Sequence, residues 1–140
     1  MIFQRQPVNY YLSVALVVLA GFNAMSQSST INRKQLLTAN IGDHFVKKVD
    51  IREIILNPGQ KAPYHKHPCP VVGFIVSGSV LFQIEGDSLR TLKAGEAFYE
   101  PANMPITHFD NASNTEPLNF VAYYLLNDEK ELIEILEAKK

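Results

Sequence analysis

The chain has 140 residues, and its 13 Lys and Arg against 14 Asp and Glu give a formal net charge of -1. This balance argues against a nucleic-acid-binding surface, and a hydrophobic content of 46% argues against a disordered chain. The single cysteine, Cys69, excludes an intrachain disulfide framework and any site that needs several cysteines from one chain. The length suits one domain.

Residues 1–26 have the pattern of a secretory signal peptide. Arg5 precedes a short apolar run over residues 10–22, and small residues at positions -3 and -1 precede a cleavage site before Gln27. The apolar run is short for a bilayer span. We therefore predict an exported protein, periplasmic or secreted, with no stable membrane span after cleavage. The alternative is an uncleaved membrane anchor.

The sequence after the cleavage site predicts a β-rich domain. Residues 27–45 are expected to form a linker and lead-in, and residues 46–126 the domain itself. Many short strands separated by turn residues favour a sandwich or a barrel. The continuous run 71–76 is typical of a strand buried on both faces. The apolar runs predict strands at 49–56, 71–76, 80–84, 89–92, 97–99, 107–109 and 118–126.

Residues 127–140 have a different pattern and are predicted to form an amphipathic helix. Leu132, Ile133, Ile135 and Leu136 are apolar and have acids and lysines between them, a pattern typical of a helix with one buried side. Asn127 or Asp128 is placed to cap the N-terminus, and two lysines stand at the favourable C-terminal end.

His65 and His67 form the most informative pair in the sequence. On an extended strand, residues i and i+2 point to the same side, so the two imidazoles are placed to share one metal ion while Lys66 points away. Prolines on both sides of the pair favour an extended backbone.

The stretch that contains this pair resembles the cupin superfamily, in particular its small single-domain bacterial members. In the first cupin motif, a glycine precedes His-x-His by five residues, and a glutamate and a second glycine follow. Gly59, His65, His67 and Gly78 match this motif. The resemblance implies a double-stranded β-helix, or jelly roll, which holds its site in the open mouth of the barrel and commonly forms a homodimer.

The second cupin motif is matched less completely. Gly95 and Pro101 have the family spacing, and Asn111 stands near the expected end of the motif. The motif glycine after Pro101 is replaced by Asn103, which tolerates a left-handed backbone. The motif histidine falls at Ile106.

The first motif also departs from the family, because its glutamate falls at Val71 or, with the longer spacing, at Val72. Neither valine can bind a metal. Two of the four usual family ligands are therefore substituted.

Two further residues are candidates for completing the site. His108 lies two residues beyond Ile106, so on a regular strand it would face the same way and supply a third imidazole. An ordinary hydrogen-bonded histidine is the alternative for His108. Glu100 is the nearest strand-end carboxylate and is a candidate fourth ligand or catalytic acid/base group. Polar side chains that could also contribute are Tyr64, Gln83 and Tyr99.

A site of three imidazoles with open positions suits Zn, Ni, Mn, Fe or Cu, and the sequence does not rank these metals. We therefore predict an exported small cupin that binds a divalent metal and a small-molecule ligand in the barrel mouth, with oxygenase- or isomerase-type activity. One alternative is a non-catalytic binding or sensing module with a degenerate, metal-free site. Another is a metal-free enzyme that uses a histidine as general base.

Overall fold

The computed structural model describes residues 30–137, so the predicted signal segment 1–26 lies outside the described residues. The chain divides into two units, Met1–Arg33 and Lys34–Lys140. The described part of the first unit, residues 30–33, has no regular secondary structure, and the second unit contains the nine strands of the described chain. Within residues 30–137 there is no helix with the length and apolar character needed to cross a membrane.

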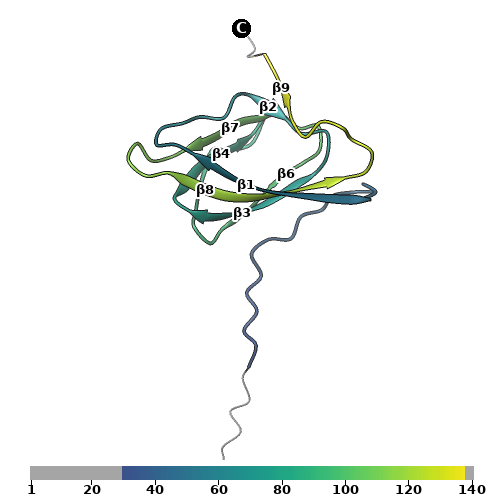
Figure 1. The fold of residues 1–140 in the computed structure, drawn as a ribbon, viewed down its shortest axis with the longest axis horizontal. Coiled ribbons are helices and arrows are strands. Elements are labelled where there is room, and N and C mark those ends of the chain that lie inside the picture. The colour runs from purple at the N-terminus through teal and green to yellow at the C-terminus, as the bar shows by residue number, and fades with distance from the viewer. Residues whose placement is uncertain (1–29, 138–140) are drawn as a thin grey trace, which may run out of the picture. The chain divides into compact units, whose positions relative to one another are not determined.

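The strands form two antiparallel sheets that face each other (Figure 1). The first sheet has the order β1-β8-β3-β6, and the second has the order β5-β4-β7-β2-β9. Each sheet therefore combines strands from the first and second halves of the domain. The strands are β1 (Lys48–Leu56), β2 (His65–Lys66), β3 (Val71–Ser77), β4 (Ser79–Ile84), β5 (Arg90–Lys93), β6 (Ala97–Glu100), β7 (Ile106–Asn111), β8 (Leu118–Leu126) and β9 (Glu134–Ile135).

This arrangement is the all-β jelly roll that the sequence predicts, and each predicted strand is present. The short strands β2 and β9 were not predicted. The run 71–76 was expected to be buried on both faces, but β3 fully buries only alternate residues. Its outer side chains Val72 and Phe74 are half-buried and line a groove together with Leu36 and Leu37 of the lead-in.

The predicted C-terminal helix is wrong for the described part of its segment. Residues 127–137 contain no helix, and β9 pairs with β2 instead. The backbone N–H of Leu136 donates to the carbonyl of Tyr64 at 2.9 Å, and the Lys66 ammonium lies 3.2 Å from the Glu134 carboxylate. These contacts with the barrel outweigh the weak helical preference of a short amphipathic segment.

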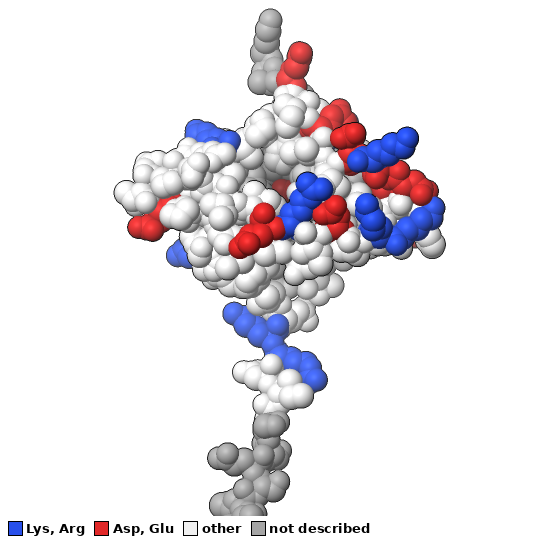
Figure 2. Space-filling model, in the orientation of Figure 1, with Lys and Arg blue, Asp and Glu red and all other residues white. Residues whose placement is uncertain are grey.

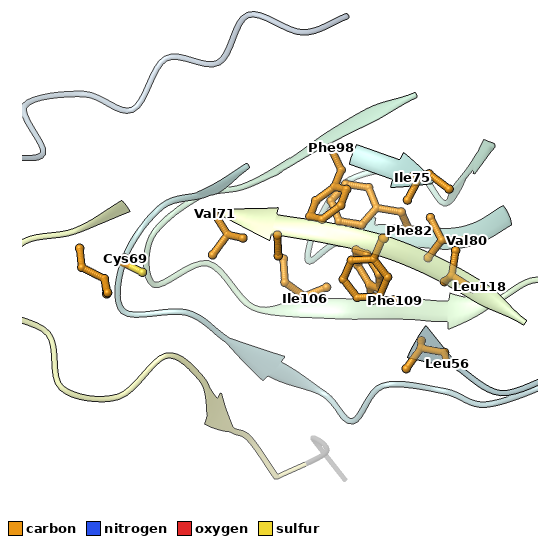
Figure 3. Close-up of a cluster of buried hydrophobic side chains, with 13 residues drawn as sticks. Leu56, Cys69, Val71, Ile75, Val80, Phe82, Phe98, Ile106, Phe109 and Leu118 are labelled. Atoms are coloured by element: carbon orange, nitrogen blue, oxygen red, sulfur yellow. The ribbon is translucent and has the colours of Figure 1, made fainter. Parts of the chain in front are cut away.

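An aromatic core fixes the spacing between the two sheets. Phe82, Phe98 and Phe109 are at most 4% exposed and lie together between the strands (Figure 3). The ring centroids of Phe98 and Phe109 are 5.0 Å apart in an edge-to-face arrangement, and those of Phe109 and Phe120 are 4.7 Å apart. Such ring pairs add to the stabilisation from apolar burial.

Two turn residues at positions of motif glycines adopt left-handed backbone conformations. Gly78, between β3 and β4, has φ of 80°, and a Cβ at this position would lie 2.7 Å from the carbonyl oxygen of Pro117. Glycine is therefore required there both for conformation and for space. Asn103, which replaces the motif glycine, has φ of 61°, a left-handed conformation that asparagine tolerates.

The charged surface agrees with the balanced composition. On the face shown in Figure 2, acidic and basic side chains lie beside one another, and no broad area of that face is purely basic.

Candidate metal centre

The first sheet contributes a buried carboxylate to the interior. Register pairs Val71 of β3 with Glu100 of β6 on one side and with Tyr124 of β8 on the other. Residues directly opposite in an antiparallel ladder share a face, so these three side chains form one inward-facing row. The Glu100 residue is only 3% exposed.

The second sheet brings the two histidines to the same place. His65 lies on β2 opposite Ile106 of β7, and His67 follows directly after the strand. Both histidines are 4% exposed, whereas Lys66 between them turns outward to Glu134. The imidazole centroids are 5.0 Å apart, so the structure places the pair on one side of the chain, as the i, i+2 spacing predicts.

The three side chains converge closely enough to share one ion. One ligand atom from each of His65, His67 and Glu100 lies within 4.8 Å of those of the other two. The closest approach is 3.0 Å, between Nε2 of His67 and Oε2 of Glu100. The residues predicted separately as ligands and as an acid/base group therefore form a single cluster.

Backbone carbonyls determine which ring nitrogens face this cluster. Nδ1 of His65 lies 2.6 Å from the carbonyl oxygen of Pro63, and Nδ1 of His67 lies 2.5 Å from that of Leu132. A carbonyl can only accept, so each Nδ1 carries the proton and each Nε2 is left to bind an ion or another proton. Metal-binding histidines usually have such an outer partner.

The two histidines differ in their electrostatics. Burial lowers the pKa of His65 below its ordinary value, and the Pro63 carbonyl only partly opposes this effect. Burial also disfavours the charged form of His67, but the hydrogen bond and negative charge of Glu100, together with the hydrogen bond to the Leu132 carbonyl, outweigh burial and raise the pKa of His67. Burial, together with the charge of Glu100, raises the pKa of Tyr124 to about 12, so this side chain remains a phenol at neutral pH.

His108 does not join the cluster. The ladder between β4 and β7 pairs Gln83 with His108 but Ile84 with Ile106, which leaves Thr107 as an extra residue. This β-bulge reverses the side to which the following residues point, so the assumption of a regular strand was wrong. The His108 side chain is 43% exposed, and its Nδ1 lies 2.8 Å from Oδ2 of Asp110.

The other polar candidates have partners away from the cluster. The Tyr64 hydroxyl donates to the Glu85 carboxylate at 2.9 Å. The side-chain amide of Gln83 donates to the carbonyl of Asp87 at 2.8 Å, and the hydroxyl of Tyr99 donates to the carbonyl of Asn40 at 3.3 Å.

Sequence reasoning missed three components of the site: Tyr124 in the cavity wall and the carbonyls of Pro63 and Leu132, which accept from His65 and His67. A backbone carbonyl carries no sequence signal. The chain segment that supplies the Leu132 carbonyl was expected to be a helix. Ile133, the next residue, lines the cavity beside the cluster. The C-terminal segment is therefore part of the site.

A cavity of about 150 Å³ adjoins the cluster, and His65, His67 and Glu100 are all in its wall. The cavity gives a small molecule room beside the three ligand atoms. The arrangement can therefore hold a metal ion and a small molecule together, or move a proton between His67 and Glu100.

Comparison with known proteins agrees with this architecture. A family model described as "Cupin domain" matches residues 52–124. No curated protein sequence matches the chain.

Several solved structures share the fold. DMSP lyase DddQ from Ruegeria pomeroyi DSS-3 is 22% identical, with a TM-score of 0.54 over 62% of this chain and 42% of that one. A cupin-like protein from Thermotoga maritima msb8 is 23% identical, with a TM-score of 0.55 over 63% and 64% of the two chains. Oxalate oxidase with bound glycolate is 25% identical, with a TM-score of 0.53 over 63% and 46%. The match spans less than two thirds of each of these proteins.

Proposed function

Because the chain belongs to the cupin family, we propose that it holds a divalent transition metal with His65, His67 and Glu100 and binds a small organic molecule beside the metal. One observation carries this proposal. Three buried donor atoms lie within 4.8 Å of one another, and both histidines have Nδ1 turned to a carbonyl. That leaves both Nε2 atoms and a carboxylate for an ion.

The donor set suits first-row transition metals. Two imidazoles and one carboxylate are compatible with Zn, Ni, Mn, Fe or Cu, and the same set occurs in non-haem Fe(II) oxygenases. A bound ion would supply Lewis-acid chemistry and, with only three protein ligands, would keep positions open for water or substrate.

The remaining chemistry comes from residues beside the ligands. The Tyr124 phenol, with its pKa of about 12, stays protonated and can donate a hydrogen bond in the wall of the same cavity. Glu100 combines a negative charge with proximity to His67, which suits it to accept a proton. A structural neighbour at 25% identity, named oxalate oxidase, supports an oxidising activity of the oxygenase type on a small molecule.

The decisive experiment is elemental analysis of the purified protein beside two single variants. We expect near-stoichiometric metal in the wild type and in His108→Ala, and none in His65→Ala. His108→Ala is the matched control because it also removes one imidazole, from outside the cluster. Absence of metal from the wild type after incubation with Zn, Ni, Mn and Fe(II) would refute a metal site.

A second candidate function is metal-free acid–base catalysis. The observation that favours it is the buried His67–Glu100 pair, whose 3.0 Å separation is suitable for proton transfer within the barrel. Turnover that survives exhaustive chelation and is lost in Glu100→Gln would support this function over the metal-dependent one.

We also propose that residues 1–26 direct export. The support is the sequence pattern of a basic residue, a short apolar run and small residues before Gln27. Intact-mass measurement of protein recovered from the periplasm or medium tests this proposal, and a mass that begins at Gln27 is expected.

We further propose a homodimer formed through β1, which lies at the edge of the first sheet among the described strands. Ile51 and Ile55 on this strand are each 59% exposed. An antiparallel pairing of two copies centred on Ile51 would place Asp50 of one copy opposite Arg52 of the other. Light scattering should give the mass of a dimer, and Ile51→Lys should give a monomer. A monomeric wild type would contradict the proposal.

A further inference from the structure

The cavity beside the His65–His67–Glu100 cluster, here called its metal end, has polar walls at that end and apolar walls further from it. At one end it is bounded by the row of Tyr124, Val71 and Glu100. Two residues further along the same strands, the next row contains Ala122 and Phe98, which also line the cavity. The wall therefore turns from polar to apolar within one step of the sheet.

The far part of the cavity is entirely apolar. Register places Ile54 opposite Phe120, one further row from the metal centre, and Leu56 lies beyond them on β1. From the opposite sheet, Phe109 completes this end, with its ring centroid 4.7 Å from that of Phe120. Phe98 and Phe109 lie together between the sheets in Figure 3.

The charged groups of the cavity are confined to the metal end. Among the described residues that line it, none is Lys, Arg or Asp, and the ionisable groups are His65, His67, Glu100 and Tyr124. A second charged group on a ligand would therefore lie among phenylalanine and aliphatic side chains without a partner, which is costly.

We infer that this site takes a small molecule with one polar head group and an uncharged hydrocarbon tail or ring. The head group would meet the His65–His67–Glu100 end, and the tail would occupy the Ile54–Phe109–Phe120 end. The whole cavity, about 150 Å³ including the end at His65, His67 and Glu100, matches the size at which apolar protein cavities accept benzene, so the head group and tail together have about the size of benzene. The position of the head group rests on the proposed metal function, whereas the apolar tail site does not.

The length of the tail should control affinity. Each buried methylene contributes about 0.8 kcal/mol, which corresponds to about a fourfold gain in affinity. The gain should stop when the cavity is full. By contrast, a molecule of equal length with charge at both ends should lose affinity.

The test uses calorimetric titration of the zinc-loaded full chain with the linear monocarboxylates from acetate to hexanoate. We expect affinity to rise about fourfold per carbon until the cavity is filled. Succinate, which has the carbon number of butyrate and a second carboxylate, should bind at least tenfold more weakly than butyrate. Equal binding of succinate and butyrate, or affinity independent of chain length, would overturn the inference.

Two variants locate the tail within the cavity. Ala122→Leu fills the space next to the metal row and should abolish the dependence on tail length while leaving the metal content unchanged. Ala97→Leu is the matched control, because Ala97 lies outside the cavity and lines the groove on the outer face of the sheet. If Ala122→Leu does not fold, Ile54→Phe tests the same expectation from β1.

Metal content measured on the same samples distinguishes failure of the apolar tail site from failure of the proposed metal function. Stoichiometric metal without dependence on tail length would overturn the inference and leave the metal function standing. Dependence on tail length in protein that takes up no metal would support the apolar site and refute the proposed metal function.

Discussion

Glu100 on β6 lies directly opposite Val71 on β3. Val71 is one of the two positions at which the first cupin motif places its glutamate. Directly opposite residues have Cβ atoms about 5 Å apart on the same face, so Glu100 presents its carboxylate to the space beside that position from the neighbouring strand. The chain therefore retains a buried carboxylate at the site although the motif position is apolar.

Replacing Glu100 should change the titration of His67. In the metal-free protein, NMR titration should give His67 a pKa above its ordinary value and His65 a pKa below it. In Glu100→Gln the pKa of His67 should fall, because the negative charge of Glu100 that raises it is lost. Glu96→Gln, a change at a carboxylate outside the cavity, should leave the pKa of His67 unchanged.

The raised pKa of His67 also predicts how the free energy of unfolding depends on pH. Because the folded-state pKa of His67 is raised, its protonation stabilises the folded metal-free protein below pH about 6.5, and this contribution is lost as the pH rises through the raised pKa. The lowered pKa of His65 has the opposite effect, since stability is lost as the pH falls from about 6.5 through that pKa. Relative to wild type, Glu100→Gln should therefore lose stability at low pH. Urea denaturation at several pH values measures the difference, and parallel curves for the two proteins would contradict it.

The C-terminal segment should control metal affinity. A chain that ends after Glu131 lacks the Leu132 carbonyl that accepts from His67 and lacks Ile133 in the cavity wall. Loss of such an outer partner typically weakens metal binding by about 10- to 100-fold. Competition with a chromophoric chelator measures the affinity for zinc. A chain that ends after Glu137 keeps both groups and should bind as the wild type does; equal affinity in the shorter chain would contradict the role of Leu132.

Gly78 should be more sensitive to substitution than Gly86. Both have positive φ, but a Cβ at Gly78 would meet the Pro117 carbonyl at 2.7 Å, whereas nothing lies within 4 Å of one at Gly86. Gly86→Ala should lower the free energy of unfolding by about 1 kcal/mol, because alanine disfavours the positive φ. Gly78→Ala should lower the free energy of unfolding by at least about 1 kcal/mol more, because its Cβ would overlap the Pro117 carbonyl. Urea denaturation of both variants gives the comparison, and equal losses would refute the steric explanation.

Cys69 should be unreactive in the native protein. Its side chain is fully buried, and burial raises the pKa of the thiol to about 11, so little thiolate is present at neutral pH. A chromogenic disulfide reagent should react slowly with folded protein and quickly in denaturant. As Cys69 is the one cysteine of the chain, the signal is unambiguous. Rapid native labelling would show that the site opens readily.

The parts of the fold that follow from local pattern were predictable from the sequence. Alternating apolar residues and turn glycines located the main strands, and the spacing of His65 and His67 placed both on one side. The bulge at Thr107 was not predictable, because an extra residue in a ladder depends on the partner strand and not on local composition. It is this bulge that separates His108 from the other histidines.

The prediction of a C-terminal helix was wrong for a related reason. Its residues suit an amphipathic helix in isolation, yet pairing with β2 and the contact of Leu132 with His67 are tertiary. Glu100 was identified as a candidate only from its place at a strand end. Its partnership with His67 required the register of β3, β6 and β8.

The ligands of the candidate centre come from opposite sheets, with His65 on β2 of the second and Glu100 on β6 of the first. An ion bound to both would cross-link the two layers of the sandwich. No fragment that contains one motif alone could hold a complete site, so ion binding and closure of the sandwich would be coupled. Bound metal would then add to the stability of the folded chain, and with it to the resistance of the chain to proteolysis.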